Sequence, residues 1–169
     1  MTSKQSKRSK IVIADSTPLI VLGNAGYLHI LRDLFDTISI PVAVFSEVTV
    51  KMDLAAKSLV NSSEWIKVCQ LPNELSSYRF HLSLDQGEKE AIALAISENA
   101  DLILIDETKA RKEAMYQKIS CIGTIGILIL AKSNGIICEI KPVLDLMIRN
   151  GMHISQEVYE LALQAVNEL

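Results

Sequence analysis

Two aspartates directly follow the most apolar short segments of the chain. Asp15 comes after the run 11–14 (IVIA), and Asp106 comes after the run 102–105 (LILI). Short aliphatic runs of this kind indicate buried strands. In open parallel sheets, ligands bind outside the carboxyl ends of the strands, so both carboxylates are candidate site residues. Asp also favours turns, and two solvated loop residues would explain the same pattern.

Two glutamates lie in helices that are expected to border this edge. Glu47 lies in a helix that is expected to begin at Pro41, and Glu88 lies in the first turn of a helix expected over 86–98. Asp85 is the expected N-cap of the second helix and forms a capping-box pattern with Glu88. Each glutamate also has a structural explanation: a solvated helix face for Glu47, and a favourable interaction with the helix dipole for Glu88.

Four carboxylates at one sheet edge would repel one another and raise their pKa values. A hard divalent cation removes this repulsion, because Mg²⁺ and Mn²⁺ bind carboxylate oxygens and water. If the fold brings Asp15, Glu47, Glu88 and Asp106 together, they form a candidate magnesium or manganese site. Zinc is not expected, because the three cysteines and three histidines show no ligand spacing.

The composition is that of an ordinary globular chain. Its 169 residues fit one domain, with 49% hydrophobic and 22% charged residues. The net charge of −3 excludes a protein that binds nucleic acid by overall positive charge. Nucleic acid would have to bind through a local basic patch or a bound metal ion. Scattered cysteines indicate reduced thiols, and the chain lacks an apolar run typical of a signal peptide or membrane span. We therefore expect a cytoplasmic protein with no membrane association.

Short apolar strands alternate with helical patterns, which predicts an α/β fold with a parallel sheet covered by helices on both faces. Residues 1–10 read as a flexible basic tail, and residues 11–169 as a single domain. In the helix after Pro41, Val42, Phe45 and Val48 are expected to share the apolar face. Residues 71–82 show no clear pattern. The expected strands are 11–14, 37–40, 65–68 at an edge, 102–105 and 120–122. The first helix is expected to start at 16–18, with Pro18 at or near its first position, and to stop near 23–26; the remaining helices are 28–34, 54–60, 107–118, 127–133, 142–149 and 156–167.

Several site classes are excluded by their missing motifs. The first strand is followed by Asp-Ser-Thr-Pro, so neither a dinucleotide-binding GxGxxG turn nor a P-loop is present. A haloacid-dehalogenase-type phosphatase would need a second Asp at position 17, which is Thr17. A response-regulator receiver would need an acidic pair at the first strand, where only Asp15 occurs.

Five segments carry a further pattern in their order and spacing. They are 11–20 (IVIADSTPLI), 40–48 (IPVAVFSEV), 84–95 (LDQGEKEAIALA), 100–107 (ADLILIDE) and 123–128 (GTIGIL). Over about residues 11–150 the chain resembles the PIN-domain superfamily, in the branch of VapC-like toxin ribonucleases. The resemblance implies a three-layer α/β/α fold with a short parallel sheet, to which this chain adds C-terminal helices.

The resemblance also implies the site and the activity. Asp15, Glu47, Glu88 and Asp106 match the family's acidic residues, so they would bind Mg²⁺ or Mn²⁺ and act as the catalytic residues of an endoribonuclease. Ser16 matches the hydroxyl residue beside the first acid and would contact the substrate. An RNA substrate, a homodimer and an antitoxin partner follow from the same resemblance, whereas the choice of RNA over DNA does not follow from the sequence alone.

Two positions depart from the family pattern. Many PIN domains have Thr two residues before the fourth acid and another acid two residues after it, where this chain has Leu104 and Thr108. Glu88 in place of Asp is a milder change. Because of the missing acid, the sequence does not specify whether the site binds one metal ion or two. The missing acid also motivates an alternative in which the PIN fold is a binding module with a weak or inactive site.

Basic residues follow Asp106 on the same predicted helix. Lys109, Arg111 and Lys112 could hold substrate phosphates, although a solvated helix face is the preferred interpretation. The turn 123–126 (GTIG) could place backbone N–H groups near phosphate. Its glycines are explained more simply by a close-packed turn from strand to helix.

Overall fold

The computed structural model describes residues 9–169, and residues 1–8 of the expected basic tail lie outside this range. Five strands form one parallel sheet in the order β3-β2-β1-β4-β5. The strands are β1 (Val12–Ala14), β2 (Ile38–Pro41), β3 (Ile66–Cys69), β4 (Leu102–Leu104) and β5 (Cys121–Ile122). The helices are α1 (Ser16–Asn24), α2 (His29–Phe35), α3 (Val42–Thr49), α4 (Leu54–Val60), α5 (Gln86–Ser97), α6 (Thr108–Tyr116), α7 (Thr124–Ser133), α8 (Lys141–Arg149) and α9 (Gln156–Ala165), with a 3-10 turn η1 (Leu75–Ser77).

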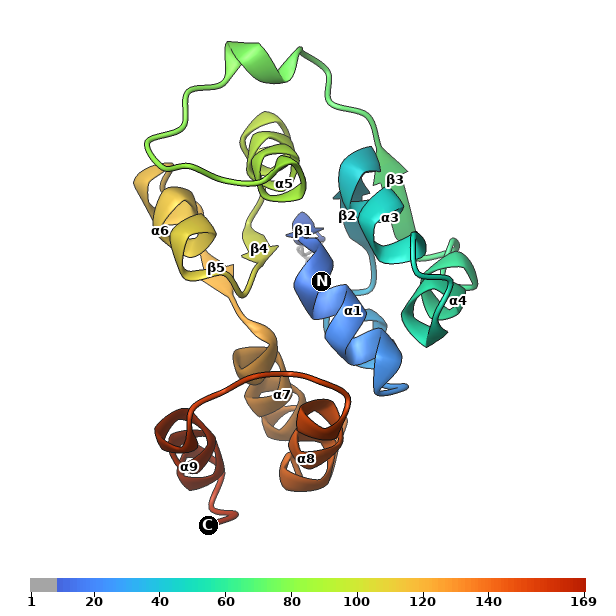
Figure 1. The fold of residues 1–169 in the computed structure, drawn as a ribbon, viewed down its shortest axis with the longest axis vertical. Coiled ribbons are helices and arrows are strands. Elements are labelled where there is room, and N and C mark those ends of the chain that lie inside the picture. Colours follow the sequence, from blue (N-terminus) through green and yellow to red (C-terminus); the bar gives the residue numbers. More distant parts are fainter. Residues whose placement is uncertain (1–8) are drawn as a thin grey trace, which may run out of the picture.

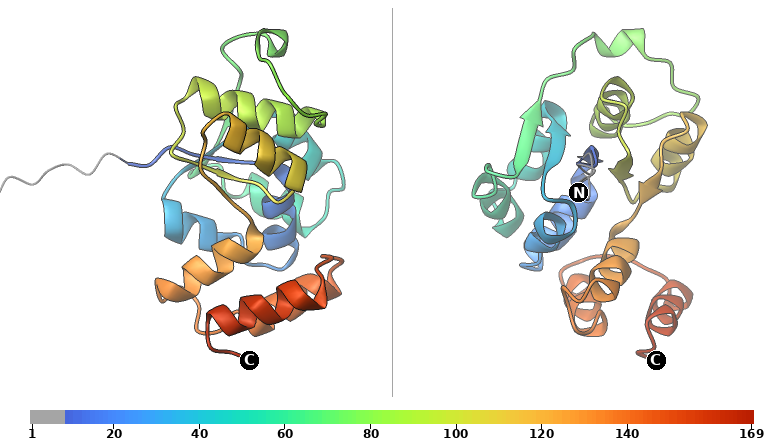
Figure 2. Two further views of the ribbon diagram at one scale, coloured as in Figure 1. Left: turned by 90° about the vertical axis from the view of Figure 1, so that its left-hand side faces the viewer. Right: turned by 180° about the vertical axis from the view of Figure 1, so that it is seen from behind.

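Helices cover both faces of the sheet, which confirms the predicted α/β class (Figures 1 and 2). Helix α5 packs on β1, β2 and β4, and α2 contacts β2 and α7 from the opposite side. The predicted C-terminal helices are present, and α7, α8 and α9 form a further layer at the bottom of Figure 1. Within residues 9–169, every helix is too short or too polar to span a lipid bilayer.

The centre of the sheet is the pair β1 and β4. Val12–Ala14 lie in register with Leu102–Leu104, and Ile13, Ile103 and Leu104 are fully buried. From β1 the chain builds outward through β2 and β3, then crosses back to β4 on the other side of β1. At such a reversal the connections diverge to opposite sides, which leaves a crevice at the carboxyl ends of the two central strands.

Apart from α7, the elements lie within two residues of their expected bounds. Helix α7 starts at Thr124 rather than at residue 127, because the carboxylate of Asp106 accepts the N–H of Thr124 and supplies an acceptor for the first turn. The expected apolar face of α3 was wrong in part. Val44 and Val48 face the core four residues apart, whereas Val42 is 43% exposed at the first position of the helix.

The segment without a clear sequence pattern connects β3 to α5 and arches over the top of Figure 1. Glu113 of α6 fixes its last part, because its buried carboxylate accepts the N–H groups of His81 (2.9 Å) and Leu82 (3.0 Å). Burial alone would raise the pKa of Glu113. Hydrogen bonds from Gln117, His81 and Leu82 outweigh burial and hold the pKa below its ordinary value.

Candidate functional site

Asp15 lies at the carboxyl end of β1, in the crevice between the two central strands. Its backbone N–H donates to the carbonyl of Leu104 at 2.9 Å, which continues the β1–β4 pairing by one step. The residue is only 3% exposed, and its Oδ1 has no hydrogen-bond partner among residues 9–169. A buried carboxylate oxygen without a partner is costly, so its presence points to a ligand that completes it.

Other carboxylates face the same point beside Gly87. A Cβ atom added at Gly87 would lie 2.7 Å from Glu47 Oε2, 3.6 Å from Asp85 Oδ1 and 3.7 Å from Asp15 Oδ1. The glycine therefore keeps the space between these three oxygens free of side-chain atoms. Glu47 comes from α3, Asp85 and Gly87 from the start of α5, and Asp15 from β1, so three separate elements build this acidic pocket.

The environment of Asp15 changes its acidity. Burial raises the pKa of Asp15 from 3.8 to about 7, against a lowering contribution from the Ser16 backbone N–H. The nearby charges of Asp85, Glu47 and Glu88 contribute smaller parts of the same rise. The raised pKa of Asp15 favours the protonated, neutral form of this carboxyl in the metal-free chain, which relieves the repulsion inside the acidic pocket.

Glu88 is held by the capping box that the sequence predicted. Asp85 Oδ1 accepts the N–H of Glu88 at 2.8 Å, and Glu88 Oε2 accepts the N–H of Asp85 at 2.9 Å. Burial raises the pKa of Glu88, while the hydrogen bond from the Asp85 N–H opposes that shift. The charges of Asp85, Glu107 and Glu47 raise it further, so Glu88 belongs to the same acidic group.

Asp106 lies at the carboxyl end of the neighbouring strand but is held by a different partner. Its Oδ1 accepts the N–H of Thr124 at 2.7 Å, and its Oδ2 accepts the hydroxyl of Thr124 at 2.6 Å. Gly123 makes this approach possible, because a Cβ atom there would lie 2.7 Å from Asp106 Oδ1. The prediction that the 123–126 turn is close-packed is confirmed at this glycine, and the turn has the added role of orienting Asp106.

The structure separates the predicted phosphate contacts. All three basic residues are exposed, but Arg111 lines a cleft together with Asp106, whereas Lys109 and Lys112 do not line it. Ser16 is the first residue of α1 and is buried beside Asp15.

Sequence reasoning assigned no site role to Asp85, Glu107, Gly87 or Thr124. The capping-box pattern located Asp85, but only as a structural cap. A glycine in the first turn of a helix, between the acids Asp85 and Glu88, is the signal that could have drawn attention to Gly87.

A fit to Mg²⁺ or Mn²⁺ is supported by the donor set and by the unpartnered oxygen of Asp15. The oxygens facing Gly87 are carboxylates, the ligands these hard cations prefer, and the space between them is free of side-chain atoms. As positioned in residues 9–169, no three acidic, His or Cys side chains close around a single point at ligand distance. The acids are therefore loosely arranged rather than closed around one point.

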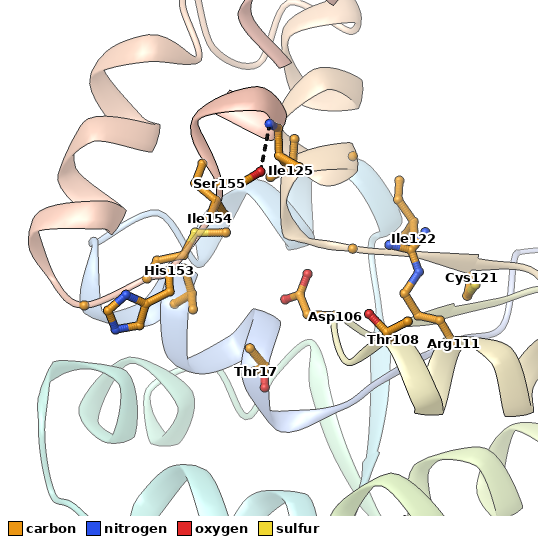
Figure 3. Close-up of a pocket in the computed structure, with 16 residues that line it drawn as sticks. Thr17, Asp106, Thr108, Arg111, Cys121, Ile122, Ile125, His153, Ile154 and Ser155 are labelled. Atoms are coloured by element: carbon orange, nitrogen blue, oxygen red, sulfur yellow. Dashed lines mark hydrogen bonds between the residues drawn. The ribbon is translucent and has the colours of Figure 1, made fainter. Parts of the chain in front are cut away.

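An open cleft of about 640 Å³ adjoins this region (Figure 3). Asp106 and Thr17 lie at one side of the cleft, and Arg111 and Thr108 of α6 lie near them. The opposite wall is the segment 151–155 before α9 together with Val158, and the Ser155 hydroxyl there accepts the N–H of Val158 at 3.2 Å. The C-terminal layer thus contributes directly to the surroundings of Asp106.

Comparison with known proteins agrees with this architecture. A family model described as DUF3368, a PIN domain, matches residues 11–168. The match covers nearly the whole chain, so the chain belongs to this PIN-domain family, and the predicted membership of the PIN superfamily is confirmed.

Two further comparisons add little to the family match. No curated protein matches the chain. Among solved structures, the chain is similar to a PilT N-terminus domain protein from the hyperthermophilic archaeon Sulfolobus solfataricus P2. The two share 15% sequence identity over 86% of this chain and 98% of that chain, with a TM-score of 0.48.

Proposed function

We propose that the chain is a metal-dependent endoribonuclease of the VapC-like branch, which hydrolyses RNA phosphodiester bonds with Mg²⁺ or Mn²⁺. The observation that carries the proposal is the buried carboxylate of Asp15, whose Oδ1 lacks a partner and faces Glu47 and Asp85 across Gly87. Membership of the PIN-domain family supports the same chemistry.

In this proposal the acidic residues hold the cation, and neighbouring groups orient them. Asp15, Glu47 and Glu88 would hold the cation at the acidic pocket, with Asp106 as a further ligand at the neighbouring strand end. When bound, Mg²⁺ or Mn²⁺ lowers the pKa of a coordinated water and stabilises charge on the phosphate. The capping box fixes the orientation of Glu88, and Thr124 fixes that of Asp106. Ser16 starts α1 directly beside Asp15, and its backbone N–H stabilises the charged form of that carboxyl.

The direct test is cleavage of single-stranded RNA in the presence of Mg²⁺ or Mn²⁺, with EDTA as the metal-free reference. Asp15→Asn should lower the rate about a hundredfold or more, because a lost ligand removes several kcal/mol of charge stabilisation. Asp33→Asn is the matched control, since Asp33 is an exposed residue of α2. Equal rates for wild type and Asp15→Asn would contradict the proposal.

A toxin role within a toxin–antitoxin pair is part of the same proposal. Induced expression of the wild-type chain should then arrest bacterial growth, and the Asp15→Asn variant should not. Growth arrest by both variants would separate toxicity from the acidic pocket. A homodimer is also proposed, and light scattering of the purified chain tests it.

The alternative is a PIN-fold binding module without catalysis. It is favoured by the departures from the family pattern, since Leu104 is fully buried in β4 and position 108 has no carboxylate. A chain that binds RNA but cleaves it neither with Mg²⁺ nor with Mn²⁺ would support this alternative over the nuclease.

A further inference from the structure

We propose that the cleft between α6, the β5–α7 turn and the C-terminal segment 151–158 binds one nucleotide of the RNA strand, next to the bond that is cleaved. The inference rests on the proposed function, because it assigns part of the substrate to a place beside the acidic pocket. Of the three basic residues that the sequence offered for phosphate, it selects Arg111, and it adds a base-binding wall from the C-terminal layer.

Arg111 is the first observation. Its side chain lines the cleft, and Nη1 lies 3.4 Å from the position of a Cβ atom added at Gly123. Within residues 9–169, the guanidinium group makes no hydrogen bond and has no carboxylate within 4.0 Å. A guanidinium with unused donors at the side of a cleft is suited to the bidentate binding of a phosphate group.

The walls of the cleft supply the second observation. Opposite Arg111, the cleft is lined by the apolar side chains of Ile125, Ile154 and Val158, and its volume of about 640 Å³ lies in the range typical of small-molecule sites. Val158 is 41% exposed, so its apolar surface is available for contact. A flat base packed on aliphatic side chains, with its phosphate at Arg111, fits this combination of surfaces.

The negative charge of Asp106 fits a nucleotide rather than a simple anion. Each Asp106 oxygen accepts one hydrogen bond from Thr124 and has capacity for another. The oxygen that does not bind the cation accepts a hydrogen bond from a ribose hydroxyl or an amino group of a base, whereas neither carboxylate oxygen can donate a hydrogen bond to phosphate. The phosphate is therefore assigned to Arg111, and the sugar or base donors to the side of Asp106.

The position of the cleft ties it to the proposed site of cleavage. Thr17, two residues beyond Asp15, lines the cleft, and Asp106 follows the strand that pairs with β1. A strand of RNA with one phosphodiester bond at Asp15 would therefore place its neighbouring nucleotide at this cleft.

The test measures binding of a fluorescein-labelled single-stranded RNA octamer of mixed sequence by anisotropy, in a buffer containing Ca²⁺. Arg111→Gln should weaken binding about tenfold, because hydrogen bonds to charged groups are stronger than those between neutral groups. It should also reduce the slope of log K against log salt by about 0.7, the value for one lost phosphate contact on a single strand. Val158→Trp should fill the cleft and weaken binding about tenfold or more through steric exclusion of the base.

Two matched variants separate the cleft from general effects. Arg32→Gln matches Arg111→Gln, because it removes the same charge on α2. Val50→Trp matches Val158→Trp, because it adds an indole at a position that is 73% exposed. Neither residue lines the cleft. Both should bind the octamer as the wild type does. Unchanged affinity and salt slope in Arg111→Gln, or unchanged affinity in Val158→Trp, would overturn the inference, as would a wild-type chain that does not bind the octamer.

Mn²⁺ titration distinguishes failure of the inference from failure of the proposed function. Arg111→Gln and Val158→Trp should bind Mn²⁺ with the wild-type affinity, because neither residue belongs to the acidic pocket. RNA binding that depends on Arg111 in a chain that binds no Mn²⁺ would retain the cleft as an RNA site and reject the nuclease.

Discussion

At the scale of single residues, two aspartates at neighbouring strand ends have opposite surroundings. Asp15 is buried with an oxygen that no described residue satisfies, whereas both oxygens of Asp106 are satisfied by Thr124. The first arrangement destabilises the metal-free chain, and the second orients a carboxylate in advance. Together they suit a site that gains stability only when a cation binds.

The pH dependence of stability tests the state of Asp15. Its pKa is about 7 in the folded chain and 3.8 as the ordinary value, so over this window the folded state holds the proton more tightly. Protonated Asp15 therefore stabilises the folded chain fully below pH 3.8, and this stabilisation is lost as the pH rises to about 7. Asp15→Asn removes this loss. In EDTA, the free energy of unfolding of the variant minus that of the wild type should rise with pH by at most about 4 kcal/mol. The difference should level off above pH 7.

Urea denaturation across pH 4–9 measures this difference, with Asp33→Asn as the control whose difference from wild type should stay flat. An Asp15→Asn variant that is no more stable than wild type at pH 8 would contradict the assigned environment of Asp15.

Thr124 should matter through its hydroxyl group. Thr124 is fully buried, and Thr124→Val leaves Asp106 Oδ2 without its donor while preserving the shape of the side chain. We expect a loss of about 1–3 kcal/mol in the free energy of unfolding. Mn²⁺ affinity should fall about tenfold, as is typical when a ligand loses its supporting hydrogen bond. Thr124→Ser should retain both properties, and equal effects of the two substitutions would show that the hydroxyl contact is unimportant.

At the scale of elements, the site depends on the segment that delivers α5. Glu113 of α6 holds this segment at His81 and Leu82, a few residues before Asp85 and Glu88. The contact fixes the path of the chain into the helix that carries the acids. It also explains why a charged side chain is retained at a fully buried position of α6.

Replacing Glu113 should loosen that segment. Glu113→Gln keeps one acceptor oxygen but loses the charge, so we expect a loss of about 1–3 kcal/mol in the free energy of unfolding. Trypsin should cut more rapidly after Arg79, which is exposed in the same segment. Glu160→Gln on α9 is the control, because Glu160 is exposed and far from the segment in sequence. An unchanged cleavage rate after Arg79 would indicate that Glu113 does not hold the segment.

The elements could be predicted where one segment carries its own signal. Buried strands need apolar runs, so the runs before Asp15 and Asp106 located β1 and β4. The capping box located the start of α5 because both of its hydrogen bonds join residues three positions apart. Glu113 could not be predicted as buried, because the His81 and Leu82 N–H groups that its carboxylate accepts lie more than thirty residues away in the sequence.

The candidate site was predictable in part for the same reason. Strand ends placed Asp15 and Asp106 at one edge, as the register of β1 and β4 shows. The hydrogen bond from Thr124 to Asp106 joins residues 18 positions apart on different elements, so no local sequence pattern predicts it. The space beside Gly87 depends on three elements meeting, which a sequence pattern does not specify.

At the scale of the whole molecule, the chain is acidic overall, with a net charge of −3 and a pI of about 5.6. Contact with RNA must then rely on local charge and bound cations rather than on a general positive field. The C-terminal layer takes part, because the segment before α9 forms one wall of the cleft beside Asp106. The PIN-domain core and the added helices thus border one region.

The central claim is that the acidic pocket binds a divalent cation, and calorimetric titration of the metal-free chain with Mn²⁺ tests it most directly. The wild type and Asp33→Asn should bind Mn²⁺, and Asp15→Asn should lose the binding. At pH 7 the binding heat should also change with the ionisation enthalpy of the buffer, because a carboxyl with a pKa of about 7 releases its proton to the solvent when it becomes a ligand. A wild type that binds no Mn²⁺, or an Asp15→Asn variant that binds it equally well, would contradict the account.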